Sequence, residues 1–195
     1  DWGVHLLDMA LWAKNISHEP KKVLASGANY NTNGYSRETY EVMDVNYPMD
    51  DYMIHWSHTA GIQTGPYDKA YGVAFIGENG TILADRGDWS IRQGGKEDGE
   101  QATKIAKENF NYEGKSDMDN HVLDFLNCMR NRSLTKCTVE MGRNVALYAH
   151  MGNIAVRSGA QILDWDANLG KFKESKEADQ FIFPKYHGKW ELPKV

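Results

Sequence analysis

Residues 71–85 read YGVAFIGENGTILAD, in which two apolar runs, Tyr71 to Ile76 and Thr81 to Asp85, flank Gly77-Glu78-Asn79-Gly80. Asn-Gly between two apolar runs is the strongest short-range signal of a β-hairpin. The stretch therefore predicts two antiparallel strands, and it sets the class of the fold before any other segment is considered.

Further strands are predicted on both sides of this hairpin. Three precede it, at Lys21 to Tyr30, Glu41 to Tyr47 and Tyr52 to Thr59, and one follows it at Trp89 to Arg92. Strands that run consecutively are typical of an antiparallel sheet, whereas a nucleotide-binding domain alternates strands with helices. Gln93 to Lys115 is polar and glycine-rich, so we expect a surface excursion there.

Three segments show the apolar spacing of helices, namely Gly3–Lys14, Met118–Arg130 and Thr138–Ser158. The second is expected to turn its apolar residues inward, and these are Val122, Phe125, Leu126 and Met129. The tail from Gln161 to Val195 is predicted to be irregular. We therefore expect one α+β domain over residues 1–195, a mostly antiparallel, open-faced sheet with helices packed on one face.

Large side chains occur at both alternating parities of residues 41–59. Val42, Ile54 and Trp56 share one parity, and Met43, Val45, Tyr47 and Met53 share the other. A sheet with one solvated face would alternate between apolar and polar residues. Because the helices can cover one face only, we expect a homo-oligomer that forms through the open face of the sheet.

Composition and charge exclude several classes of protein. The 195 residues carry a net charge of −5, so no basic surface for nucleic acid is expected. No apolar run approaches the roughly 18–20 residues of a membrane span. Cys128 and Cys137 fit no metal or disulfide spacing, which favours a reducing compartment and hence the cytoplasm. The chain begins at Asp1 inside a helix pattern, so we expect a piece of a longer protein, and a periplasmic location stays open.

The first helix carries the residues best suited to chemistry. Asp1, His5, Asp8 and Trp12 are spaced so that they share one helical face. A carboxylate one turn from a histidine can orient its ring and make it a proton shuttle near neutral pH. Spacing alone fits an N-terminal cap at Asp1 and a surface histidine equally well. Asp1, His5 and Asp8 could also ligate a metal together. Carboxylate–histidine pairs one turn apart on a helix are common without a metal, however, and no metal site is predicted.

Two further pairs are candidates for substrate binding. Trp56 and His58 share one face of the predicted strand 52–59, where they could stack on a sugar ring. Half-buried aromatic residues are also what strands ordinarily carry. Asn153 and Arg157 share one face of the last helix and could hold a hydroxyl or a carboxylate, or could serve as an ion pair or cap.

Two stretches resemble the Gfo/Idh/MocA family of oxidoreductases. Residues 1–12, DWGVHLLDMALW, look like its D-x-G-x-H-x-x-D-x-x-x-W segment, which opens the first long helix of the C-terminal domain. Residues 150–157, HMGNIAVR, and 163–166, LDWD, resemble runs near the end of bacterial sugar-oriented members. The resemblance implies that His5 is the general base at a substrate hydroxyl. It also implies that Asp1 orients His5 or contacts the sugar, and that Asp8 is a second polar contact.

The resemblance further implies a substrate-side domain whose N-terminal Rossmann domain is absent from this sequence. Neither G-x-G-x-x-G nor the family's E-K-P motif occurs, so we expect NAD or NADP to bind in the intact parent protein and not to this chain alone. The parent would oxidise or reduce a hydroxyl of a sugar, polyol or glycoside. Two alternatives stay open: glycoside cleavage by transient oxidation and elimination, and a non-catalytic sugar-binding or interaction module.

Overall fold

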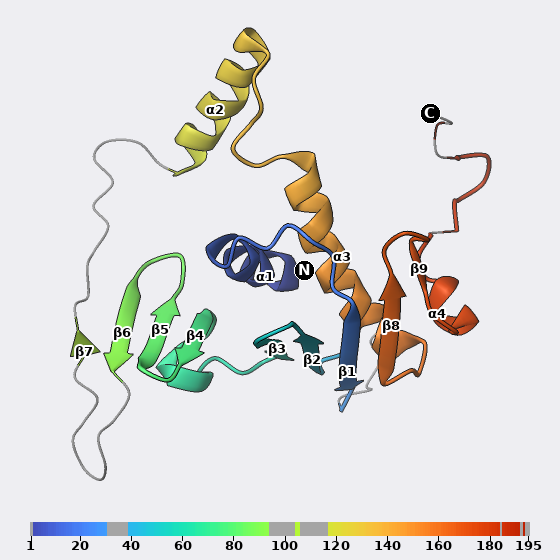
Figure 1. Cartoon of the computed structure of the whole chain (residues 1–195), viewed down its shortest axis with the longest axis horizontal. Coiled ribbons are helices and arrows are strands. Elements are labelled where there is room, and N and C mark those ends of the chain that lie inside the picture. The colour runs from blue at the N-terminus through green and yellow to red at the C-terminus, as the bar shows by residue number, and fades with distance from the viewer. Residues whose placement is uncertain are drawn as a thin grey trace.

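The computed structural model describes residues 2–30, 39–93, 104–105, 117–183, 185–191 and 193. Its strands form two open sheets, and every strand pairing in the described residues is antiparallel (Figure 1). The predicted α+β, open-faced class is confirmed, with the sheet divided in two. Most of the predicted excursion from Gln93 to Lys115 lies outside the described residues.

The first sheet has the strand order β3-β2-β1-β8-β9. Its strands are β1 (Lys22–Ala28), β2 (Val42–Pro48), β3 (Met53–Thr59), β8 (Ile162–Asp166) and β9 (Lys171–Phe172). The prediction of an irregular tail was wrong, because β8, β9 and the short helix α4 (Lys176–Asp179) lie within it. Leu163 and Trp165 are buried and alternate with more exposed neighbours, so β8 has the period of a strand and pairs with β1.

The second sheet has the order β4-β5-β6-β7 and contains the predicted hairpin. Its strands are β4 (Val73–Gly77), β5 (Gly80–Ala84), β6 (Trp89–Gln93) and β7 (Lys104–Ile105), and a 3-10 turn, Pro66–Asp68, precedes them. Gly77 pairs with Gly80, so the two-residue loop is Glu78–Asn79. This pairing makes Gly80 the first residue of β5, and its φ of 148° is a backbone conformation that favours glycine.

Helices α1 (Trp2–Ala13) and α3 (Val139–Arg157) cover one face of the first sheet (Figure 1). The core consists of buried residues from all three layers: Leu7 and Leu11 of α1, Val23, Val45 and Leu163 of the sheet, and Tyr148, Met151 and Ala155 of α3. The helix faces predicted from apolar spacing are therefore the buried faces of α1 and α3.

One close approach sets the depth of α3 on the sheet. A Cβ atom at Gly152 would lie 2.8 Å from Cγ2 of Val45, nearer than real Cβ atoms come. Beside it, the Tyr47 hydroxyl donates a hydrogen bond to the carbonyl oxygen of Tyr148. Burial raises the pKa of Tyr47, so its hydroxyl stays protonated and remains a donor.

The register of β2 with β3 corrects the reasoning from parity. Val45 lies opposite Trp56, and Tyr47 lies opposite Ile54, so the large residues of opposite parity share the face that the helices cover. The other face carries Asp44, Asn46, His55, Ser57 and Thr59, with Leu24, Met53 and Ile162 among them. The sheet therefore alternates as a sheet with one solvated face does, and oligomerisation stays a prediction.

Helix α2 (Asp117–Asn131) does not turn its apolar residues inward, contrary to the prediction. It projects away from the sheets in Figure 1, and Val122, Phe125 and Met129 are exposed. The periodicity of α2 showed which residues share a face, but periodicity carries no information about what that face packs against.

We predict that Gly152→Ala destabilises the protein by about 1–3 kcal/mol, because the new methyl group must displace the branched Val45 side chain. Gly142→Ala on the same helix is the matched control. No atom lies within 4 Å of its added Cβ, so helix propensity should stabilise it by about 0.5–1 kcal/mol. Urea unfolding measures both, and equal effects of the two substitutions would contradict the close approach.

Candidate functional site

Helix α1 presents the predicted catalytic face to solvent. Leu6, Leu7 and Leu11 are buried, whereas His5 and Asp8 are exposed on the opposite side. Three-residue spacing places His5 and Asp8 one turn apart on this face. Asp1, the other predicted catalytic residue, lies outside the described residues.

The environment of Asp8 differs from that of an ordinary surface carboxylate. Partial burial of the carboxyl group raises its pKa, and the charge of nearby His5 opposes this by lowering it. Within the described part of the chain no group hydrogen-bonds the His5 ring. The imidazole is exposed, and an interacting carboxyl group lies beside it.

Trp2 joins the N-terminal end of α1 to the second sheet. Its ring lies 6.0 Å from the His5 ring and 5.2 Å from the ring of Tyr71, which precedes β4. The guanidinium carbon of Arg86, in the turn between β5 and β6, lies 5.9 Å from the Trp2 ring. We call His5, Trp2, Tyr71 and Arg86 the junction cluster. Three of its members were not predicted, although Trp2 could have been, since it lies three residues before His5 on the same helix.

The turn that carries Arg86 is braced by partly buried charged groups. Asp85 accepts hydrogen bonds from the backbone N–H groups of Gly87 and Asp88, at 2.7 and 2.9 Å. Lys69 Nζ donates to Asp85 at 2.5 Å and to Asp88 at 2.8 Å. Partial burial would raise the pKa of Asp85, but these hydrogen bonds together lower it, and the same contacts raise the pKa of Lys69. The backbone on either side of Arg86 is thus fixed.

Trp56 and His58 share one side of β3, as predicted, and their rings are 6.3 Å apart. This side faces the helices, because Trp56 lies opposite the buried Val45. Trp56 packs beneath the start of α1, because a Cβ atom at Gly3 would lie 3.8 Å from its ring and 3.7 Å from Cβ of Ala149. Trp56 is therefore partly buried against the core, and any contact with a sugar would use the remaining exposed edge of the ring.

Asn153 and Arg157 lie one turn apart on α3, and their joint binding of a substrate group stays a prediction. Asn153 is half-buried and lies one turn beyond Ala149, the α3 residue that contacts the start of α1. Arg157 is exposed, and its guanidinium carbon lies 4.9 Å from the ring of Phe181, beyond α4. The structure thus brings Trp56 to the N-terminal end of α1 with His58 beside it, while Arg157 contacts the segment after α4.

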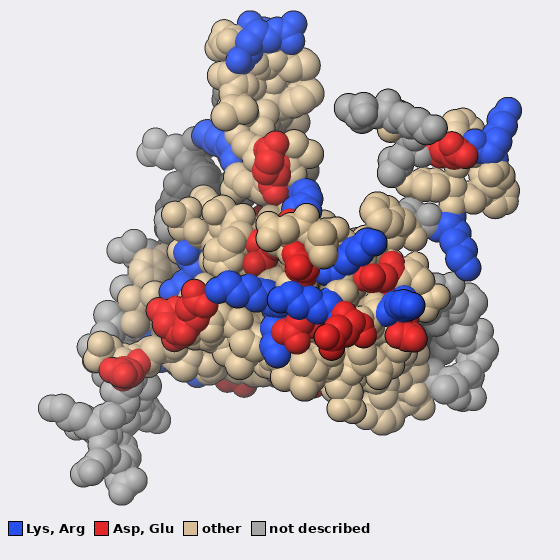
Figure 2. Space-filling view, turned by 45° about the vertical axis from the view of Figure 1, so that its right-hand side comes forward, with Lys and Arg blue, Asp and Glu red and all other residues tan. Residues whose placement is uncertain are grey.

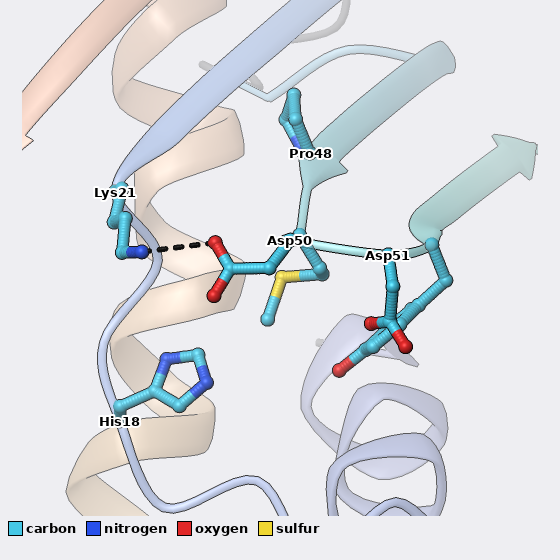
Figure 3. A pocket seen from close by; sticks show the side chains of 7 residues that line it. His18, Lys21, Pro48, Asp50 and Asp51 are labelled. Atoms are coloured by element: carbon cyan, nitrogen blue, oxygen red, sulfur yellow. Dashed lines mark hydrogen bonds and ion pairs between the residues drawn. The ribbon is translucent and has the colours of Figure 1, made fainter.

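A small hollow lies at the opposite end of α1 (Figure 3). It holds about 100 Å³ and is lined by His18, Lys21, Pro48, Met49, Asp50, Asp51 and Tyr52. Lys14, whose Nζ lies 4.4 Å from the Tyr52 ring, is nine residues from His5, which is roughly 13 Å along a helix. The hollow is smaller than ordinary ligand sites, and none of the predicted site residues lines it.

In Figure 2 positive and negative side chains intermingle in a band across the face shown, and no continuous basic surface forms there. In the described residues no group of three or more His, Cys, Asp or Glu side chains could hold a metal ion. No described helix is long and apolar enough to cross a membrane.

Comparisons with known proteins find a solved structure that shares the fold of this chain. No protein-family model matches the chain, and no curated protein matches it significantly. The structure of yvaA from Bacillus subtilis, named as an oxidoreductase, superposes with a TM-score of 0.58 at 12% identity, over 85% of this chain and 52% of that one. This chain shares its fold with about half of that oxidoreductase.

A second solved structure, of a protein from Thermotoga maritima also named as an oxidoreductase, gives a TM-score of 0.49 at 15% identity. It covers 82% of this chain and 44% of that one. The chain therefore spans about half the length of the solved structures that it resembles. At 12% identity the likeness to yvaA establishes the fold, and the reaction has to be argued from the site.

We predict that Lys69→Met lowers the free energy of unfolding by about 1–3 kcal/mol, because it leaves two carboxylates without their charged donor. The Lys69 and Asp85 side chains are only 25% and 16% exposed. Lys21→Met is the control, since the side chains of the Lys21–Asp50 ion pair are 74% and 88% exposed, and a pair this exposed to water should contribute little to stability.

The effect of Lys69→Met should also depend on pH. The folded-state pKa of Asp85 lies below its ordinary value of 3.8, so the stabilisation is complete above that value and is lost as the pH falls through the lowered pKa. Thermal unfolding of both proteins between pH 2 and 7 measures this. A difference between them that stays constant down to pH 2 would show that Lys69 acts by packing alone.

Proposed function

We propose that this chain is the substrate-side half of an NAD(P)-dependent oxidoreductase of the Gfo/Idh/MocA type, acting on a hydroxyl of a sugar, polyol or glycoside. The observation that carries the proposal is the exposed His5 ring, beside Asp8 and against the aromatic residues of the junction cluster. The shared fold with about half of a protein named as an oxidoreductase supports it.

His5 would accept the proton of the substrate hydroxyl as it is oxidised and return it in the reverse direction. The Trp2 and Tyr71 rings form an apolar surface beside His5, on which the face of a sugar ring can pack. Asp8 lies one turn away on the same exposed face, where its carboxyl group could accept a hydrogen bond from a second hydroxyl of the substrate.

NAD or NADP would accept the hydride, and the residues of this chain do not fit that cofactor. The sequence has no G-x-G-x-x-G turn, whose backbone N–H groups would hold a pyrophosphate. We therefore assign cofactor binding to a nucleotide-binding domain elsewhere in the intact protein, and we expect this chain alone to be inactive.

In the intact protein, His5→Ala should lower kcat by roughly two to four orders of magnitude, the usual contribution of a general base. The Kd for NAD(P) should hardly change, because the cofactor contacts lie in the other domain. Steady-state kinetics with a panel of sugars and polyols, followed by NAD(P)H absorbance, measures the first quantity, and cofactor titration measures the second.

His121→Ala is the control, because His121 is exposed on α2, away from the junction cluster. Activity within a few-fold of wild type in His5→Ala would remove His5 as the base. A released aglycone with no net change in cofactor would replace dehydrogenation by the elimination reaction. Sugar binding with no turnover of any kind would make the chain a binding module.

We also propose that the open face of the first sheet pairs with a second copy of the chain around a two-fold axis. No described helix covers this face, and Met53 and Ile162 are exposed on it among hydrogen-bonding side chains. One such group is His55, whose Nδ1 lies 2.9 Å from Oδ1 of Asn46 and whose Nε2 lies 3.4 Å from Oδ1 of Asp44.

Met53→Lys should shift a dimer toward monomer by at least tenfold in Kd, because it places a charge in the proposed interface. Ile76→Lys changes a side chain on the second sheet that is more exposed than Met53, and it should leave association unaltered. Sedimentation velocity over a wide concentration range measures both. A wild-type protein that is monomeric at every concentration would rule out the pairing.

A further inference from the structure

Arg86 is a cation presented at the tip of a fixed turn. The brace from Lys69 to Asp85 and Asp88 holds the backbone on both sides of it, and Asp85 N–H closes the turn onto the carbonyl oxygen of Asp88 at 3.0 Å. Arg86 itself is exposed. A charged side chain on a braced turn loses less conformational freedom on binding than one on a loose loop.

The two carboxylates nearest to Arg86 in the sequence are both turned toward Lys69. Among the described residues Arg86 forms no ion pair, and its contact is with the face of the Trp2 ring. A cation at about 6 Å from an aromatic ring at an exposed site is held only weakly, by about 0.5–1 kcal/mol. The turn thus positions the guanidinium group, and its one contact among the described residues is the weak one with the Trp2 ring.

Arg86 and His5 both lie beside the Trp2 ring. The Arg86 guanidinium carbon is 5.9 Å from the Trp2 ring centroid, and the His5 ring is 6.0 Å from it, so the two groups are at most about 12 Å apart. A single sugar ring with a hydrogen bond at each end spans a distance of this order. One small ligand lying along Trp2 and Tyr71 could therefore contact both groups.

We propose that Arg86 is a specificity-determining residue that binds an anionic group of the substrate, so that the substrate class is an acidic sugar carrying a carboxylate or a phosphate. The planar fork of arginine suits both anions, because it donates two parallel hydrogen bonds to either. The anion is bound at Arg86, and the hydroxyl at the far side of the ring faces His5. This inference rests on the proposed function for the role of His5, but anion binding can be measured without it.

The test is binding to the full chain without cofactor, followed by tryptophan fluorescence and by two-dimensional NMR of the indole N–H groups. The probes are D-glucuronate, D-glucose 6-phosphate and neutral D-glucose. Either anionic sugar should bind at least tenfold more tightly than glucose and should shift the Trp2 signal, which Trp2→Phe identifies by its absence. The ratio of the two anionic probes tells whether the site prefers carboxylate or phosphate.

Arg86→Gln should weaken the affinity for the preferred anionic probe by tenfold or more and leave the affinity for glucose unchanged. Arg86→Lys, which keeps the charge and loses the fork, should retain only part of the preference. Arg92→Gln is the matched control, because Arg92 lies 5.2 Å from the Tyr67 ring on the same sheet, away from His5. It should leave the affinity for all three probes as in wild type.

Three results would overturn the inference: equal affinity for glucose and the anions, no binding of either anion, or an equal loss in Arg92→Gln. The proposed function fails separately. If Arg86 selects anions but the intact protein transfers no hydride, the site stands and the oxidoreductase does not. If the intact protein oxidises neutral sugars and Arg86→Gln does not affect this, the oxidoreductase stands and the anion site does not.

Discussion

The close packing of α3 on β2 is the constraint on which the candidate site depends. The absence of a side chain at Gly152 lets Val45 and the Tyr47 hydroxyl reach the helix backbone. Because α3 lies this deep, α1 can lie beside it and still touch the sheet. A second glycine, Gly3, lets the start of α1 come down onto Trp56 and Ala149. His5 points outward because these two contacts hold the opposite face of α1, with Leu6, Leu7 and Leu11, in the core.

The second sheet contributes to the candidate site through the turn between β5 and β6. The charged side chains of this turn have different partners. Lys69 neutralises Asp85 and Asp88 in a partly buried position, where charge-assisted hydrogen bonds are strong. Arg86, between these two carboxylates in sequence, is left facing Trp2. One lysine thereby fixes the turn and keeps the neighbouring arginine from being paired within its own loop.

The sequence predicted the helical face of His5 and Asp8, the first strands and the hairpin, because each is encoded by local spacing. Register was not local: parity along β2 and β3 could not tell that Val45 and Trp56 face the same side, since that depends on the turn at Pro48. The site was half-predicted for the same reason. Tyr71 and Arg86 reach Trp2 from segments about 70 and 84 positions away, and no spacing rule connects them.

General base chemistry at His5 calls for a site from which water is excluded, because interactions between charges are much stronger there. This half of the site is open: His5 and Asp8 are exposed, and Trp12 on the same face is 75% exposed. The helix side of the molecule also carries the exposed apolar residues of α2 and the start of α3, among them Phe125 and Val139. A nucleotide-binding domain placed on this side would cover the apolar surface and shield His5 in one step. The exposure of His5 and Asp8 is therefore what we expect if a second domain, proposed to bind the cofactor, completes the site.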